Sequence, residues 1–269
     1  MKEQVAKLVK KLFKDGKIQG FLGLREANGH IQPYLFKKAE ELKEMSLGDR
    51  DKPGDSRYPL NQTLIRLAQA YPEATFGVLV RGCDDRGLVE LLKWKQLQPE
   101  KVVPIGIACP AELAVACECR QPFPDNCQVG EKQQGVEVAG SVDRVDKMAT
   151  DGRFGYWMEH FDRCVKCYGC RNICPMCFCK ECALEETDLI QTAVLPTENP
   201  IFHLTRAVHM AGRCIDCGLC EEACPADIPL RALYKKVADI LASETGYRPG
   251  FNPDQKSPLN IIETSSTAE

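Results

Sequence analysis

Two cysteine runs with the same spacing are the residues of this sequence best suited to chemistry. Each reads C-x2-C-x2-C-x3-C and is followed by proline; the cysteines are Cys164, Cys167, Cys170 and Cys174 in the first run and Cys214, Cys217, Cys220 and Cys224 in the second. The spacing is typical of cubane 4Fe-4S clusters, because three thiolates on a tight loop can each bind one corner of a cubane. Two runs therefore predict two clusters and a protein that moves single electrons.

The fourth cysteine of each run is expected to serve the other cluster, as in two-cluster ferredoxins. On that rule the ligands are Cys164, Cys167, Cys170 and Cys224 for the first cluster and Cys214, Cys217, Cys220 and Cys174 for the second. This exchange would bring the two clusters close together, as electron transfer requires. The alternatives are zinc sites and a disulfide framework. Zinc sites rarely repeat this spacing, and nothing in the sequence indicates an oxidising compartment.

A third set of cysteines is expected at one edge of a sheet. Cys83 and Cys109 each follow an apolar run that we interpret as a strand. The carboxyl ends of parallel strands share one edge, where ligands bind. Cys117 and Cys119 come shortly afterwards and could fold back to complete a third cluster. The alternative is that these are buried core cysteines.

The remaining cysteines suggest a fourth set. Cys177, Cys179 and Cys182 form a C-x-C-x2-C pattern directly after the first run, and Cys127 would complete the four. Cysteine counting alone carries this prediction, since the chain has 16 cysteines. Cys127 could equally be a bystander, and one of the other three could replace a ligand of the first cluster.

The elements that must position these cysteines are helices and short strands. The pattern predicts a helix at 60–71, a strand at 76–80, a helix at 84–95 that begins with an aspartate N-cap, and a strand at 101–107. Helices that alternate with strands in this way favour a small α/β unit with parallel strands.

The whole chain divides into four segments on this interpretation. They are an α/β module with a small parallel sheet at 1–125, a connector at 126–152, an α+β two-cluster ferredoxin-like domain with added helices at 153–245, and an extended tail at 246–269. Smaller expected elements are an amphipathic surface helix at 1–14, a short strand at 136–142, and added helices at 200–212 and 229–242. The tail is expected to be loop-like, and either to lie over a partner or to be disordered.

Composition excludes several other functions. The net charge of −3 gives no reason to expect nucleic-acid or anionic-membrane binding. No run approaches the ~20 apolar residues of a membrane span, and the N-terminus lacks the pattern of a signal peptide. Sixteen cysteines without an export signal favour a reducing cytoplasm and metal binding. Exposed clusters would also make the protein oxygen-sensitive and suited to an anaerobic host.

Several segments of the first 125 residues resemble a known family. Arg57-Tyr58-Pro59, residues 76–83 and 105–110, and Cys117-Glu118-Cys119 with the nearby Pro-Phe-Pro resemble the beta subunit of coenzyme F420 hydrogenase/dehydrogenase. The resemblance implies that Cys83, Cys109, Cys117 and Cys119 bind a 4Fe-4S cluster. The last pair is spaced C-x-C rather than C-x2-C, so Cys127 could substitute for one of them.

Residues 160–248 resemble two-cluster ferredoxin domains fused to such modules in formate dehydrogenase, hydrogenase and heterodisulfide-reductase-like complexes. The resemblance implies an iron–sulfur electron-transfer subunit of a cytoplasmic multi-subunit redox complex, with catalysis in a flavoprotein, formate dehydrogenase or hydrogenase partner. The alternatives are a flavin-containing oxidoreductase that uses coenzyme F420 or NAD(P), and a stand-alone ferredoxin-type electron shuttle. The longer FAD-binding domain of the family is replaced here, and no glycine-rich dinucleotide fingerprint is present, so we expect clusters without FAD.

Overall fold

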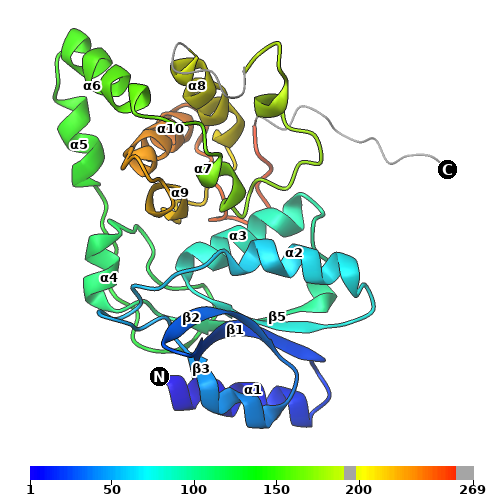
Figure 1. Ribbon diagram of the computed structural model, residues 1–269. Coiled ribbons are helices and arrows are strands. Elements are labelled where there is room, and N and C mark those ends of the chain that lie inside the picture. The colour runs from blue at the N-terminus through cyan, green and yellow to red at the C-terminus, as the bar shows by residue number, and fades with distance from the viewer. Residues whose placement is uncertain (191–197, 259–269) are drawn as a thin grey trace.

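The computed structural model describes residues 1–190 and 198–258. A sheet with flanking helices carries the N-terminal half of the chain, and a group of helices carries the cysteine runs on one side of it (Figure 1). Among the described residues, no helix combines the length and apolar character needed to cross a membrane.

The sheet is mixed, with strands in the order β2-β1-β4-β5-β6 and β3 paired to β1. The strands are β1 (Gly20–Ala27), β2 (His30–Phe36), β3 (Met45–Ser46), β4 (Phe76–Val80), β5 (Val102–Ile107) and β6 (Cys127–Val129). The pairs β1–β4, β4–β5 and β5–β6 are parallel, which confirms the predicted parallel unit, whereas β2 and β3 run antiparallel to β1.

The antiparallel edge was not predicted, although the sequence signals it. The loop between β1 and β2 consists of Asn28 and Gly29, both with positive φ, at 53° and 74°. An Asn-Gly pair in this conformation is typical of the two-residue turn of a β-hairpin.

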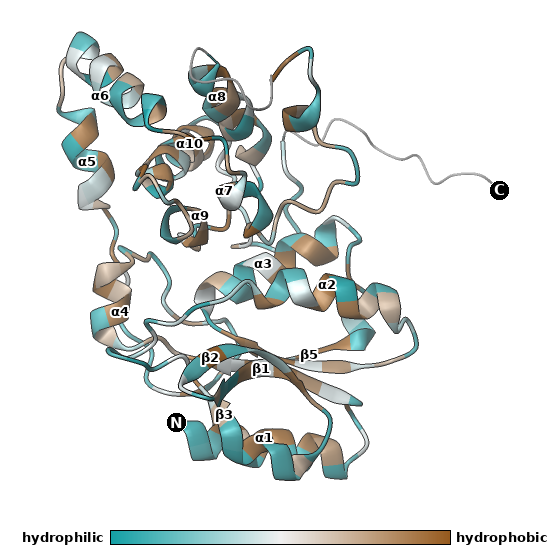
Figure 2. Cartoon of the chain, viewed as in Figure 1, coloured by the Kyte–Doolittle hydropathy of each residue, from teal (hydrophilic) through white to brown (hydrophobic). Residues whose placement is uncertain are grey.

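Helices cover both faces of the sheet. They are α1 (Lys2–Lys14) on one face, and α2 (Leu60–Ala70) and α3 (Gly82–Lys93) on the other (Figure 1). The predicted amphipathic character of α1 is confirmed, because its Val5 and Val9 are fully buried and Leu8 and Leu12 pack beside them, while its lysines are exposed (Figure 2).

The start of α3 differs from the prediction. Arg81, not Asp84, occupies the N-cap position. Asp84 lies in the first turn, where its carboxylate accepts a hydrogen bond from the backbone N–H of Arg81 at 3.0 Å. An acidic side chain three residues into a helix closes the first turn in this way, so α3 starts closer to β4 than predicted.

The connector is helical where a strand was predicted. Its helices are α5 (Gly140–Asp146) and α6 (Thr150–Asp162), preceded in the chain by α4 (Ala111–Ala116). The alternating valines at 136 and 138 suggested a strand, but Val138 is exposed and no strand lies beside them. A strand needs a neighbour for its backbone hydrogen bonds. Val136 donates a single bond to the carbonyl of Cys119 at 2.8 Å, and Val142 donates to Ala139 in the first turn of α5.

The second half of the chain is built from helices of unequal length. They are α7 (Gly169–Asn172), α8 (Asn199–Met210), α9 (Leu219–Glu222) and α10 (Leu230–Thr245). The predicted added helices are confirmed as α8 and α10. One continuous set of buried apolar side chains joins this half to the sheet module, so the cysteine runs are held against the α/β module by shared packing.

The described part of the tail packs on this chain itself. Tyr247 is fully buried. Its hydroxyl and the backbone N–H of Gly250 both donate hydrogen bonds to the carboxylate of Glu90 on α3, at 2.9 and 2.7 Å. Residues 246–258 are loop-like, as predicted, but they pack on this chain and were expected to lie over a partner or to be disordered. Residues 259–269 of that segment lie outside the described residues.

Candidate metal centres

The two cysteine runs fold into loops of the same shape. In the first, Lys166 and Tyr168 have positive φ, at 49° and 59°; in the second, Asp216 and Gly218 occupy the same positions, at 54° and 78°. The left-handed conformation costs energy for residues other than glycine and is maintained mostly at functional sites. Here it turns backbone N–H groups toward sulfur.

Backbone hydrogen bonds to sulfur recur in both loops. The N–H groups of Lys166 and Gly169 donate to Sγ of Cys164 and Cys167 at 3.4 and 3.5 Å. The backbone of the second loop donates to Cys214 and Cys217 in the corresponding way. Such bonds stabilise thiolates and sulfur-bound clusters.

The cysteines of the two runs line two small cavities. The first cavity is lined by Cys164, Cys167, Cys170 and Cys224. The second is lined by Cys214, Cys217, Cys220 and Cys174. Each cavity thus collects three thiols from one run and one from the other.

Burial favours the protonated form of five of these thiols. Desolvation raises the pKa of Cys164, Cys170, Cys217 and Cys220, and raises the pKa of Cys214 to about 12. Metal ligands must be deprotonated, so iron would supply the missing charge and release protons on binding. The described residues include no group of three or more His, Cys, Asp or Glu placed around a single metal ion. A cubane is wider, because each thiolate binds a different iron.

A buried histidine offers an unused donor at the first cavity. His203 on α8 lines this cavity and stacks on Phe161 of α6, with ring centroids 4.5 Å apart. Both ring nitrogens are buried and lack a hydrogen-bond partner among the described residues. Burial, followed by the nearby charge of Arg206, lowers the pKa of His203 to about 4. The ring is therefore neutral, and its N–H suits a cluster sulfur.

Three members of the predicted third set gather around two arginines. Arg86 is 3% exposed and donates to Sγ of Cys119 at 3.8 Å. Burial opposes its charge, but the nearby Cys119, Cys83 and Asp216 together outweigh this and raise the pKa of Arg86. Burial likewise raises the pKa of Cys109, while the neighbouring Arg81 acts in the opposite direction. No ion pair between Arg86 and a carboxylate occurs in the described part of the chain.

The fourth member of that set has a different neighbour. Cys117 accepts a hydrogen bond from Arg231, which also pairs with Asp216 of the second cysteine loop at 2.8 Å. The loop that holds Cys117 is thus tied to the second cysteine run. Lys235 on α10 strengthens the connection, since its ammonium donates to the carbonyl of Glu118 at 2.8 Å.

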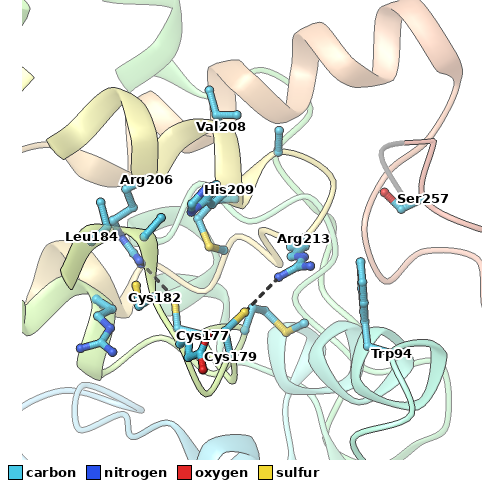
Figure 3. A pocket seen from close by; sticks show the side chains of 16 residues that line it. Trp94, Cys177, Cys179, Cys182, Leu184, Arg206, Val208, His209, Arg213 and Ser257 are labelled. Carbon is cyan, nitrogen blue, oxygen red and sulfur yellow. Dashed lines mark hydrogen bonds between the residues drawn. The ribbon is translucent and has the colours of Figure 1, made fainter. Parts of the chain in front are cut away.

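The predicted fourth set is only partly brought together. Cys177, Cys179 and Cys182 line one cavity of about 520 Å³, shown in Figure 3. Cys127 is not among the described residues that line it. It lies instead on β6, beside Gly106 of β5, and its thiol donates to the carbonyl of Val129 at 3.6 Å.

The buried arginines are the functional residues that sequence reasoning missed. Arg206, Arg86 and Arg81 are 2%, 3% and 7% exposed, and each lies beside cysteine thiols. A buried charge is unstable unless it is paired. An anionic cluster at each cysteine set meets that requirement, so the residues present fit the predicted clusters. One signal was available for Arg206, which interrupts the apolar face of a helix.

Comparison with known proteins supports 4Fe-4S chemistry at the second cysteine run. Residues 207–229, which include the second cysteine run, match the family model of the 4Fe-4S binding domain. The chain is 40% identical over 144 residues to the F420-dependent formate dehydrogenase subunit beta of Methanocaldococcus jannaschii, covering 53% of this chain and 38% of the relative. It is 42% identical over 103 residues to the F420-dependent formate dehydrogenase 1 subunit beta of Methanococcus maripaludis, covering 38% of this chain and 26% of the relative.

The predicted resemblance to an F420-dependent dehydrogenase beta subunit joined to a 4Fe-4S domain is thereby confirmed. The chain spans less than two fifths of the length of either relative.

Proposed function

We propose that this chain is an iron–sulfur electron-transfer subunit of a multi-subunit redox complex and relays single electrons through 4Fe-4S clusters. One observation carries the proposal: each of two small cavities is lined by four cysteines, three from one run and one from the other. The match of residues 207–229 to the 4Fe-4S binding domain supports the same chemistry. A bound cluster supplies a group that takes up and releases one electron at a time.

The exchanged cysteines set the distance between the first two clusters. Cys170 and Cys174 lie four positions apart on one loop, yet they line different cavities. Two clusters bound in this way share a short stretch of backbone. The role of the surrounding chain is to hold them in series, to donate N–H groups to sulfur and to exclude water.

The third cysteine set adjoins the second cluster site. Cys83 and Cys217 line one small cavity. Arg57 donates a hydrogen bond to the carbonyl of Cys217 at 2.8 Å and pairs with Glu222 of α9. We therefore place a third cluster, held by the cysteines at 83, 109, 117 and 119, beside the second. Electrons would pass between the α/β module and the first cluster through the second.

Of these three clusters, the first would lie nearest to the protein surface. Cys167 is exposed, whereas the other three cysteines of its cavity are less so. A partner that docks over the first run would lie close to the cluster. The four cysteines of the third site are buried or half-buried, so exchange from that side requires contact with the α/β module.

We assign catalysis to partner subunits. The names of the relatives describe beta subunits of F420-dependent formate dehydrogenases. By analogy, the complex would be a formate dehydrogenase, or a hydrogenase or heterodisulfide-reductase-like assembly with a flavoprotein partner. The sixteen cysteines, all free thiols here, favour the reducing cytoplasm for this work.

The experiment that tests the proposal is elemental analysis of the anaerobically purified full chain, together with its flavin content. Three clusters predict at least about 12 irons and as many sulfides per chain. Fewer than about 8 irons would contradict even the two-cluster relay. One bound flavin per chain would favour the alternative, an oxidoreductase that uses coenzyme F420 or NAD(P).

A further inference from the structure

The cysteines that follow the first run form a site of their own. We propose that Cys177, Cys179 and Cys182 hold an additional 4Fe-4S cluster through three thiolates, with Cys127 taking no part. The inference rests on the proposed electron-transfer function and extends it. It adds one more cluster that can exchange electrons with the second cluster.

Three separate backbone positions bring these thiols to one cavity. Cys177 follows the proline that ends the first run, Cys179 lies two residues later, and Cys182 immediately precedes the short helix Ala183–Glu185. All three line the cavity of about 520 Å³ between this loop and α8 (Figure 3). The C-x-C-x2-C spacing spreads the thiols along one bend of the chain. Three corners of a cubane can be bound from such a bend.

A buried arginine supplies the first sign of an anion at this site. Arg206 donates from Nη1 to Sγ of Cys177 at 3.1 Å and from Nη2 to the carbonyl of Cys170 at 2.8 Å. Its Nε is buried without a hydrogen-bond partner. No carboxylate among the described residues forms an ion pair with it. A guanidinium buried in this way requires a counter-charge, and thiolates bound to a cluster provide one.

A second arginine faces the same cavity from the opposite side. Arg213 donates to Sγ of Cys179 at 3.7 Å. Its guanidinium lies over the ring of Trp94 at 4.0 Å and near that of Phe178 at 5.6 Å. The two aromatic rings hold the group in place beside the thiol. Figure 3 shows Arg213 donating to Cys179, with Trp94 on the same side of the cavity. Two cysteines of the three thus have an arginine as a direct donor.

The site adjoins the second cluster. The thiol of Cys177 is hydrogen-bonded to that of Cys174, the cysteine that the first run contributes to the second cavity. Arg206 lines both cavities. A cluster at the three-cysteine site would therefore neighbour the second cluster, which already adjoins the first and third. The second cluster would then have three neighbouring clusters with which it can exchange electrons. The additional cluster reaches the protein surface at the exposed Cys179.

Three thiolates leave one iron of a cubane without a cysteine. The cavity beside them has room for a ligand that is not cysteine, and its lining includes His209. Zinc is the alternative occupant, because three thiolates and one open position also suit a zinc ion. Metal analysis separates the two.

The test uses the full chain, purified without oxygen, and two variants. Cys179→Ala with Cys182→Ala removes two of the three ligands at the accessible end of the site. Cys127→Ala is the matched control. We expect the double variant to lose about four irons and four sulfides per chain relative to the unchanged protein. We expect the control to lose none, and both variants to keep the reduced EPR signals of the two ferredoxin-type clusters.

Three results would overturn the inference. They are unchanged iron in the double variant, equal iron loss in Cys127→Ala, and loss of zinc in place of iron and sulfide. The ferredoxin-type EPR signals show that the variant is folded. If the double variant lost these signals as well, the single variant Cys179→Ala would be tested in its place, with the same iron count as the criterion. Failure of the electron-transfer proposal would look different, because the unchanged protein would then lack those signals.

Discussion

Arginines beside sulfur are the residues that connect this structure to electron transfer. Arg206 contacts Cys177 and Cys170 from a fully enclosed position, and Arg86 contacts Cys119 in the same manner. A positive charge next to a cluster stabilises its reduced, more negative state. These side chains should therefore raise the reduction potentials of the clusters that they face.

Replacing Arg206 with methionine tests this role. Arg206→Met keeps much of the side-chain volume and removes the charge and both hydrogen bonds. A hydrogen bond from a charged group contributes roughly 1.5–3 kcal/mol. About 1.4 kcal/mol corresponds to roughly 59 mV for one electron. The reduction potential of the cluster nearest to Arg206 should therefore fall by about 60–120 mV. Redox titration followed by EPR measures the shift.

Two controls make the Arg206 result specific. Arg206→Lys keeps the charge and should recover part of the lost potential. Arg66→Met changes an exposed arginine on α2 and should leave every potential unchanged. An unaltered potential in Arg206→Met, with full iron content, would show that the arginine is structural only.

His203 should change the reduction potential of the first cluster and of no other. His203→Phe keeps the stacking on Phe161 and removes the buried ring N–H. A neutral hydrogen bond contributes roughly 0.5–1.5 kcal/mol, or about 20–60 mV for one electron. The first cluster should become harder to reduce by that amount in the same titration. A shift confined to the second cluster would contradict the placement of His203.

At the scale of elements, the features that could be predicted are those encoded within a short stretch of sequence. Contacts between distant segments could not be predicted. The two cysteine loops could be predicted, because each ligand set is mostly contained in eleven consecutive residues. The helices α8 and α10 followed from apolar periodicity. The position of Cys127 could not be predicted, because a count of cysteines says nothing about which strand carries each one. The buried arginines were missed for a similar reason, since their partners come from distant segments.

The contact between α3 and the tail is the element-scale feature most open to test. Glu90 is 0% exposed, pairs with Lys93 at 2.6 Å and accepts hydrogen bonds from Tyr247 and Gly250. Glu90→Ala removes the acceptor of Tyr247 and Gly250 and the carboxylate that pairs with Lys93, whose ammonium keeps the carbonyls of Asn252 and Gln255. Loss of one partner of a buried ion pair destabilises by roughly 3–5 kcal/mol. Hydrogen exchange of residues 246–251 should accelerate strongly.

The exposed Glu100 provides the comparison for this experiment. Glu100→Ala should leave the exchange of the tail unchanged. Equal protection in both variants would mean that apolar packing of Tyr247, rather than the carboxylate, holds the tail on α3.

At the scale of the whole molecule, the proposed cluster sites form one connected set. The second site touches the first through exchanged cysteines, the third through the cavity shared by Cys83 and Cys217, and the three-cysteine site through Cys174 and Cys177. The α/β module and the helical half share one core, so the spacing between sites is fixed by packing. A chain with this arrangement suits a subunit that joins several redox partners.

The exchange of cysteines between the two ferredoxin-type sites is the central claim, and EPR of the dithionite-reduced chain tests it most directly. We predict a broadened spectrum from two magnetically coupled clusters. Cys224→Ala should then alter the signal of the first cluster, whereas Cys174→Ala should alter the signal of the second. A spectrum without coupling in the unchanged chain, or two variants that alter the same cluster, would contradict the account.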